Sequence, residues 1–184
     1  MRLISAELAG VHLLEPVRRG DARGWFAEVY KRGLLGAAGL NEDWPQENQS
    51  LSRAAGTVRG LHFQKPPFAQ AKLVRVLAGA VLDVVVDLRR GSPSFRRVQA
   101  FELSAENGLQ LYVPEGFAHG FCTLAPDTQV AYKVSAPYVA ESEAGLAWDD
   151  PELGVAWPVT AATAVLSPRD RAWPALAELL TPFP

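Results

Sequence analysis

Short runs of β-branched and aliphatic residues, separated by glycine and proline, fill the chain between about residues 48 and 135 and most constrain its fold. The pattern is typical of antiparallel sandwiches and barrels, because each run suits a strand but is too short for a helix. It predicts seven or more strands, among them 72–78, 81–88, 97–103, 109–113, 117–124 and 129–135. The first two are expected to form a hairpin across Gly79 and Ala80.

Helical signals are few and lie outside this region. A short helix is predicted around 34–39, and the segment SPRDRAWPALAELL offers Ser167 as an N-cap before Pro168. With 184 residues, no internal repeat and no linker-like change of composition, residues 1–184 are predicted to form one all-β domain with small helical additions. The edge strands of such a sheet favour pairing with a second copy, so a homodimer is expected.

Composition argues against several classes of protein. The formal net charge of −2 gives no overall basic surface for nucleic acid. Cys122 is the only cysteine, so neither a disulfide framework nor a thiolate-only metal site is expected, and a cytoplasmic location is predicted. No apolar run approaches the roughly 18 residues of a membrane span, and the opening MRLISAELAG lacks a leader pattern, so no membrane association is expected.

Two glycine–histidine spacings carry a first resemblance. GLQLYVPEGFAHGF contains His119, and Gly56 is followed after five residues by His62. Both segments resemble motifs of the cupin superfamily, which implies a double-stranded β-helix, or jelly-roll barrel. Where the metal-binding version of the motif has a second histidine and a glutamate, this chain has Gln64 and Lys72. An ammonium group has no lone pair to give, so no metal is predicted.

Strand alternation indicates that three polar side chains point inward. Residues two apart share a face of a strand, and Lys72, Tyr132 and His119 each alternate in phase with apolar neighbours. Such residues suit a pocket lined by hydrophobic groups with a few converging polar ones. Taken alone, Tyr132 and His119 are better explained as core residues whose polar atoms find partners. A buried lysine without a partner or a function is costly.

Six segments, in order over about 150 residues, carry a closer resemblance. They are DARGWFAEVY at 21–30, QENQSLS at 46–52, and further segments at 59–95, 102–121, 131–158 and 166–170. They make the chain similar to the dTDP-4-dehydrorhamnose 3,5-epimerase family of the cupins. The resemblance implies epimerisation of dTDP-4-keto-6-deoxy-D-glucose at C3 and C5, in dTDP-L-rhamnose biosynthesis, without a cofactor. It also implies a homodimer that exchanges strands.

The same resemblance implies roles for four residues. His62 would be the general base and Asp170 the carboxylate that orients it. Lys72 would stabilise the enolate that forms when the proton leaves. Tyr132 would return a proton from the opposite face of the sugar.

Further residues are implied as substrate contacts. Arg23 and Arg59 match positions that bind the diphosphate, where a guanidinium makes paired hydrogen bonds. The other matching positions are Phe26, Glu28, Gln46, Asn48, His119, Tyr138, Glu143 and Arg169. Arg59 and His62 would face opposite sides of a regular strand. Either Gly60 forms a bulge, or Arg59 serves the site of a partner chain.

Three other functions stay open at this point. A relative that acts at only one of the two carbons would share these motifs, although Tyr132 favours the double epimerase. A non-catalytic cupin that binds a sugar nucleotide is disfavoured by the intact set of His62, Lys72, Tyr132 and Asp170. A metal-dependent cupin isomerase or dioxygenase would be recognised by metal analysis of the purified protein.

Overall fold

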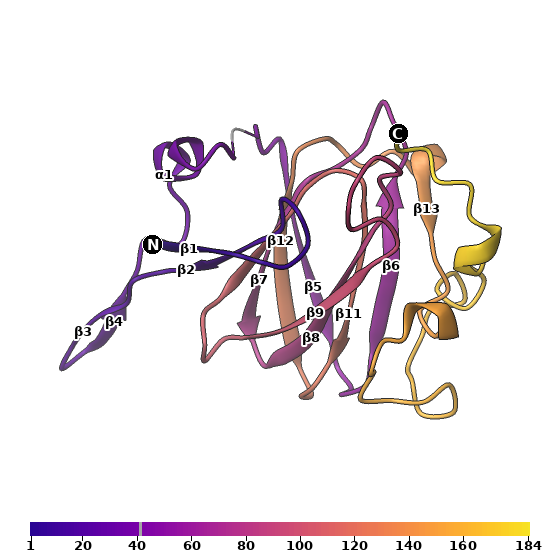
Figure 1. Ribbon diagram of the computed structural model, residues 1–184. Coiled ribbons are helices and arrows are strands. Elements are labelled where there is room, and N and C mark those ends of the chain that lie inside the picture. Colours follow the sequence, from indigo (N-terminus) through magenta and orange to yellow (C-terminus); the bar gives the residue numbers. More distant parts are fainter. Residues whose placement is uncertain (41) are drawn as a thin grey trace.

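Two antiparallel sheets pack against each other in the computed structural model, which describes residues 1–40 and 42–184 (Figure 1). The larger sheet has the strand order β1-β2-β10-β7-β12-β5 and the smaller one β13-β6-β11-β8-β9. The chain is therefore almost entirely β, as the sequence predicted, and its sheets have the arrangement of a jelly-roll barrel.

The larger sheet combines two strands from the N-terminal segment with four from the rest of the chain. Their bounds are β1 Arg2–Ser5, β2 His12–Glu15, β5 Gln46–Ser52, β7 Lys72–Ala78, β10 Gln110–Val113 and β12 Thr128–Val134. Those of the smaller sheet are β6 Val58–Gln64, β8 Ala80–Asp87, β9 Val98–Ser104, β11 Phe117–Thr123 and β13 Glu143–Gly145. The six strands named from the sequence are all confirmed within one residue at each end.

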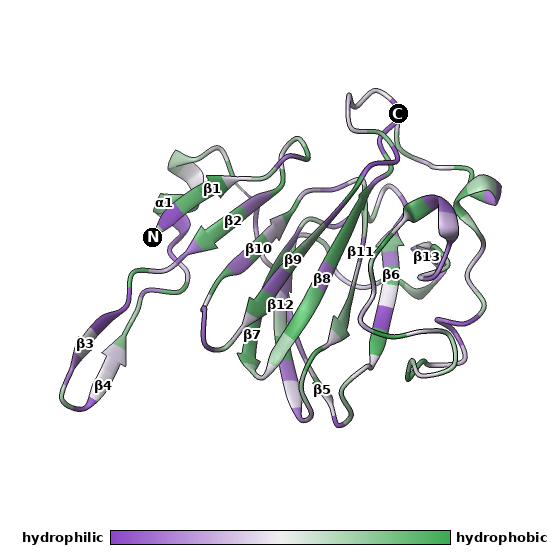
Figure 2. Cartoon of the chain, turned by 60° about the horizontal axis from the view of Figure 1, so that its bottom comes forward, coloured by the Kyte–Doolittle hydropathy of each residue, from purple (hydrophilic) through white to green (hydrophobic). Residues whose placement is uncertain are grey.

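The main core lies between the two sheets. Val74 and Val130 of the larger sheet pack in one cluster with Val85, Phe101 and Phe121 of the smaller one, and each of these side chains is buried. Figure 2 shows the apolar colouring along β7, β8 and β11, the strands that line this interior. Successive residues of a strand point to opposite faces, so one face of each sheet contributes to this core, while the other face of the smaller sheet packs against a second apolar cluster.

The predicted hairpin across Gly79 and Ala80 is wrong. β7 and β8 lie in different sheets, and Gly79 is the single residue between them. One residue is too short for the two-residue turn that a hairpin needs, but it is enough for the chain to cross from one sheet to the other. Gly79 has φ +76°, and a Cβ there would lie 2.3 Å from Oγ1 of Thr128.

Helices are short and peripheral. The helix predicted around 34–39 is present as α1 Arg32–Ala37. The segment after Ser167 forms no α-helix: it turns at 168–172 and continues, beyond Pro174, to a single 3-10 turn, η3 Leu176–Glu178. Pro174 has no N–H for a helical hydrogen bond, which explains the break. The other 3-10 turns are η1 Ala140–Ser142 and η2 Pro151–Leu153.

A two-stranded hairpin, β3 Arg19–Asp21 with β4 Gly24–Phe26, projects from the body (Figure 1). Trp25 and Phe26 on it are 59% and 69% exposed. An isolated hairpin of two strands is only marginally stable in water, and these two aromatic side chains leave it with an exposed apolar surface.

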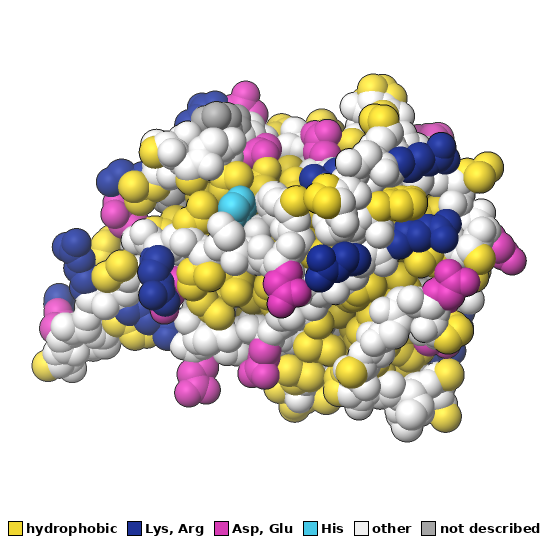
Figure 3. All heavy atoms as spheres, in the orientation of Figure 1, with side chains coloured by type: hydrophobic (Ala, Val, Ile, Leu, Met, Phe, Trp, Pro, Cys, Tyr) yellow, Lys and Arg dark blue, Asp and Glu magenta, His cyan; other side chains and the backbone are white. Residues whose placement is uncertain are grey.

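The surface seen in Figure 3 mixes Lys and Arg with Asp, Glu and apolar side chains, without a basic stripe on that face. Among residues 1–40 and 42–184, no helix is both long enough and apolar enough to cross a membrane.

The crossing at Gly79 gives a test of the fold. Gly79→Ala should lower the free energy of unfolding by about 1–3 kcal/mol, because the new Cβ meets Thr128 in a left-handed conformation. Urea unfolding at a fixed protein concentration measures this. Gly33→Ala in α1 is the matched control: no atom lies within 4 Å of its Cβ position, and stability should hold or rise slightly. Equal effects of the two substitutions would contradict the assignment.

Candidate active site

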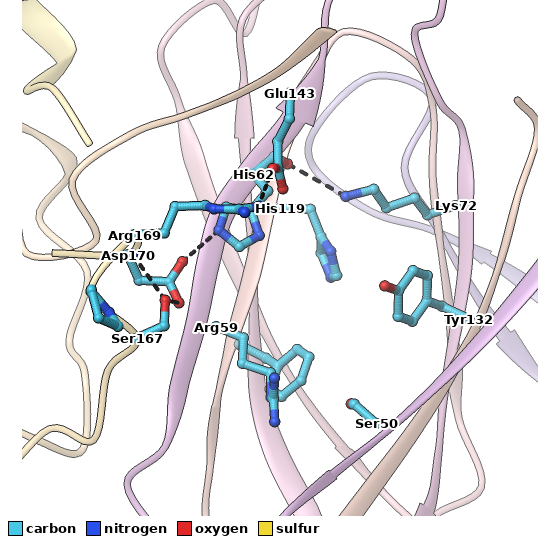
Figure 4. Close-up of a pocket in the computed structure, with 12 residues that line it drawn as sticks. Ser50, Arg59, His62, Lys72, His119, Tyr132, Glu143, Ser167, Arg169 and Asp170 are labelled. Atoms are coloured by element: carbon cyan, nitrogen blue, oxygen red, sulfur yellow. Dashed lines mark hydrogen bonds and ion pairs between the residues drawn. The ribbon is translucent and has the colours of Figure 1, made fainter. Parts of the chain in front are cut away.

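A cavity of about 580 Å³ opens between the two sheets, a size suited to a small-molecule ligand. Strands of both sheets and the loop at 167–170 contribute its lining. The lining residues are Ser50, Arg59, His62, Lys72, His119, Phe121, Tyr132, Glu143, Ser167, Pro168, Arg169 and Asp170. All four residues predicted to be catalytic therefore meet in one pocket (Figure 4).

His62, on β6, is held by Asp170. The His62 Nε2 and Asp170 Oδ1 atoms are 2.5 Å apart, and the Ser167 hydroxyl donates to the other carboxylate oxygen at 2.8 Å. Burial raises the pKa of Asp170, but the hydrogen bonds from His62 and Ser167 outweigh it and hold that pKa below its usual value. Asp170 is thus an ionised acceptor at neutral pH. Nε2 of His62 must donate the proton, which leaves the lone pair on Nδ1.

Lys72 brings a cation to the pocket from β7. Its side chain is buried, and Nζ donates to the backbone carbonyl of His62 at 3.4 Å. Burial lowers the pKa of Lys72 to about 8, while the negative charges of Asp83 and Glu143 oppose this shift. The ammonium group is therefore mostly charged at pH 7, in surroundings where its charge acts strongly.

Tyr132 faces the pocket from the sheet opposite His62. It lies on β12 of the larger sheet, whereas His62 lies on β6 of the smaller one. Figure 4 shows Tyr132 and Lys72 projecting from one side of the pocket and His62, with Asp170 beyond it, from the other. Burial raises the pKa of Tyr132, more than Asn48 and Arg59 lower it. The phenol consequently keeps its proton at neutral pH and can donate it.

A bulge in β6 brings Arg59 to the same pocket as His62. In the ladder between β6 and β11, His119 pairs with His62 but Phe121 pairs with Arg59, so β6 holds one extra residue. Gly60 has φ +129°, and a Cβ on it would lie 2.6 Å from the backbone of β11. Of the two explanations for Arg59, the bulge is confirmed.

The rim of the pocket carries a further polar group. Tyr138 donates its hydroxyl hydrogen to Glu143 at 2.9 Å, and Arg169 forms an ion pair with the same carboxylate. Tyr138, Gln46 and Asn48 line a smaller cavity of about 240 Å³ that shares His62, Lys72, Tyr132 and Glu143 with the first. These predicted contacts therefore adjoin the main pocket.

Three predicted substrate contacts lie elsewhere. Arg23 is at the tip of the projecting hairpin, 90% exposed, and pairs with Asp21 at 2.6 Å. Phe26 and Glu28 line a separate cavity of about 400 Å³ near the base of that hairpin. Within a single chain, these three residues do not join the pocket around His62, because the hairpin extends away from the body.

Some residues of the site were missed in the sequence. Asp83, on β8, is completely buried and contacts Nε2 of His119 through both carboxylate oxygens, at 2.9 and 3.0 Å. A charged residue inside the apolar run VLDVVV was the signal that could have revealed it. Ser50, Phe121, Ser167 and Pro168 also line the pocket without having been predicted there.

Gln64, at the position where metal-binding cupins have a histidine, holds neighbouring loops through hydrogen bonds to their backbone. Its side-chain amide donates to the carbonyls of Phe68 and Pro137, and its oxygen accepts from the backbone of Val139. In the described part of the chain, no group of three or more His, Cys, Asp or Glu side chains is arranged to hold a metal ion.

Comparison with known proteins gives concordant matches. Residues 5–178 match the family model of dTDP-4-dehydrorhamnose 3,5-epimerase. The chain is 51% identical to a dTDP-4-dehydrorhamnose 3,5-epimerase of Sinorhizobium fredii over 179 residues, covering 97% of this chain and 91% of that protein. It is similar to the crystal structure of a dTDP-4-dehydrorhamnose 3,5-epimerase from Bacillus anthracis with TDP and PPi bound (TM-score 0.92, 48% identity, 95% and 99% of the two chains).

A third similar protein carries a sugar. It is a dTDP-6-deoxy-D-glucose-3,5-epimerase from Legionella pneumophila in complex with dTDP-4-keto-L-rhamnose, with a TM-score of 0.91 and 38% identity over 97% of this chain and 94% of that one. The shared fold thus extends over nearly the full length of each chain.

The burial of Lys72 predicts an unusual stability effect. Lys72→Met should raise the free energy of unfolding at pH 7 by up to roughly 3 kcal/mol, because the native state holds the proton less tightly than the unfolded chain. The gain should shrink as pH rises from about 8 towards the ordinary lysine value of 10.5, where the native ammonium loses its proton first. Chemical denaturation across this pH range measures it.

Lys133→Met is the matched control on the neighbouring strand β12. Its ammonium group is 2.8 Å from the Glu47 carboxylate at the surface of the sheet, so its loss should bring no such gain. A Lys72→Met protein that is less stable than wild type at pH 7 would show that the buried ammonium group does not lower the free energy of unfolding.

Proposed function

The chain belongs to the dTDP-4-dehydrorhamnose 3,5-epimerase family, and we propose that it carries out this isomerase reaction with His62, Lys72, Tyr132 and Asp170 as its chemical groups. The substrate is dTDP-4-keto-6-deoxy-D-glucose, which is inverted at C3 and C5 to dTDP-4-keto-L-rhamnose in dTDP-L-rhamnose biosynthesis. One observation carries the assignment of residues. A base and an acid face each other from opposite sheets across a pocket that also holds a buried cation.

The first step is removal of a proton from a carbon beside the ketone. Nδ1 of His62 has the free lone pair, because Nε2 donates to Asp170. When Nδ1 takes the proton, the imidazolium is stabilised by the Asp170 carboxylate at 2.5 Å. The ketone already acidifies the C–H bonds at C3 and C5, so the proposed chemistry needs no cofactor.

Lys72 then acts on the charge that develops. The electrons of the broken C–H bond move onto the ketone oxygen and form an enolate. A cation already held in a buried position stabilises that oxygen without reorganisation of solvent. Lys72 is the group in the pocket that matches this requirement, since its side chain is 8% exposed and its ammonium points towards His62.

Tyr132 completes the inversion. The phenol gives its proton to the carbon from the face opposite the one that His62 deprotonated, and the electrons return from oxygen to carbon. Burial favours the neutral phenol before this transfer. The same pair then serves the second carbon after the ring has been repositioned, and the deprotonated Tyr132 and protonated His62 exchange protons with solvent between steps.

The nucleotide part of the site involves a second copy of the chain in this proposal. Arg59, His119, Glu143 and Arg169 lie in the pocket, whereas Arg23, Phe26 and Glu28 are carried by the projecting hairpin or its base. We propose a homodimer in which each hairpin reaches the partner's pocket. The exposed Trp25 and Phe26 support this arrangement. The proposed location is the cytoplasm, in keeping with the single, buried thiol of Cys122.

Isotope exchange tests the proposed chemistry. Incubation with dTDP-4-keto-6-deoxy-D-glucose in heavy water should place deuterium at both C3 and C5, located by mass spectrometry and NMR. His62→Ala should lower exchange at both carbons by roughly 10²–10⁴-fold, the usual value of a positioned base. Tyr132→Phe should retain exchange but impair inversion.

His12→Ala is the matched control, because His12 lies on β2 outside the pocket and its loss should leave exchange unchanged. Label at one carbon alone would select a single-site epimerase. Absence of label in the folded wild-type protein would leave a sugar-nucleotide-binding cupin, and exchange that persists in His62→Ala would overturn the choice of base.

Mixing of variants tests the exchange of hairpins. Arg23→Ala should lower kcat/KM by about 10- to 100-fold through lost contacts with the diphosphate. When equal amounts of Arg23→Ala and His62→Ala are refolded together, half of the dimers should contain one chain of each variant. One of the two sites in each mixed dimer is intact, so activity should recover to about a quarter of the wild-type value. If mixed dimers form but the activity of the mixture stays at the level of Arg23→Ala, both residues belong to the site of the same chain.

A further inference from the structure

Trp173 contacts His62 from outside the pocket. It lies three residues after Asp170, and its indole meets the imidazole in a T-shaped arrangement, with centroids 5.9 Å apart and planes at 70°. Trp173 does not line the cavity in which His62 and Asp170 are found. It therefore meets the imidazole on the side turned away from the cavity.

A missing side chain makes room for this indole. Gly145 on β13 is the register partner of His62 on β6, and a Cβ on Gly145 would lie 2.6 Å from the Cδ2 and Cε2 atoms of Trp173. The indole thus occupies a slot beside the base that any larger residue at position 145 would close. The strand pairing that places His62 also places the slot.

No polar contact explains why a tryptophan fills the slot. The indole Nε1 is buried and has no hydrogen-bond partner within the described residues. A buried N–H left unpaired costs about 1–3 kcal/mol, so an apolar residue would be expected there if filling space were the only need. What distinguishes the indole is its edge-to-face contact, as a large rigid ring, with the imidazole.

We propose that Trp173 is a positioning residue for His62, an inference that rests on His62 being the base of the proposed function. A single hydrogen bond donated by Nε2 to Asp170 fixes one nitrogen but leaves the imidazole free to tilt about it. The indole restricts that tilt, keeps Nε2 on Asp170 and Nδ1 towards the pocket, and excludes water from the back of the pair. Small errors in the position of a catalytic group lower rates severely, which makes such a restraint valuable.

Trp157 offers a matched control. It also stacks edge-on against an aromatic ring, that of Trp148, with centroids 5.8 Å apart and planes at 63°. Its Nε1 donates to the Trp148 carbonyl at 2.7 Å, and neither tryptophan lines the cavity around His62. Loss of this indole removes comparable packing without touching the base.

The test follows the His62 ring directly by ¹⁵N NMR of histidine-labelled protein without substrate. The chain has only three histidines, so His62 is assigned by substitution. Wild type and Trp173→Phe should show one tautomer, protonated on Nε2. Trp173→Leu and Trp173→Ala should show a mixture, with exchange of the Nε2 proton with water at least about 10-fold faster. Trp157→Leu should lower the Tm without changing either signal.

Kinetics give the second readout. Trp173→Leu should reduce kcat by about 10- to 100-fold with KM within about 3-fold, and Trp173→Phe should restore most of kcat. An unchanged tautomer in Trp173→Leu, or equal losses of kcat in the Trp173 and Trp157 variants, would overturn the proposal. Because the NMR signals need no substrate, absence of deuterium incorporation by wild type would refute the proposed function while leaving this inference separately measurable.

Discussion

The ammonium group of Lys72 is held between two β-sheets, where hydration is largely lost, and the rest of the site is arranged around that charge. Burial lowers the pKa of Lys72, and the carboxylates of Asp83 and Glu143 oppose this shift. The carbonyl of His62 accepts one of its hydrogens. The ammonium group thereby keeps its charge at the place where an enolate oxygen is proposed to form.

The jelly roll supplies the two-sided geometry that inversion needs. The larger sheet carries Lys72 on β7 and Tyr132 on β12 at one wall of the pocket, and β6 of the smaller sheet carries His62 at the other. The bulge at Gly60 adds Arg59 to the His62 side, and Gly145 opens the slot for Trp173. Small backbone features thus decide which side chains line the pocket and which one packs behind His62.

Much of this could be predicted, for identifiable reasons. Strand bounds followed from alternation, and Lys72 and Tyr132 pointed inward as their apolar neighbours indicated. The predicted hairpin at Gly79 was wrong because the alternation of inward and outward residues is the same in two cases. The next strand can pair with the one before it, or it can cross to the other sheet. Asp83 was missed since its partner, His119, is remote in sequence. Arg23 lies outside the pocket because its hairpin projects from the body, and strand alternation gives no direction for such a hairpin.

The pH dependence of substrate deuterium exchange tests the role of the buried cation most directly. The pKa of Lys72 is lowered to about 8, so the ammonium is present below that pH and lost as pH rises through it. Exchange by wild type should therefore fall above about pH 8, whereas Lys72→Arg, which keeps its charge, should show no fall in that range. The same fall in both proteins, or none in wild type, would contradict the account.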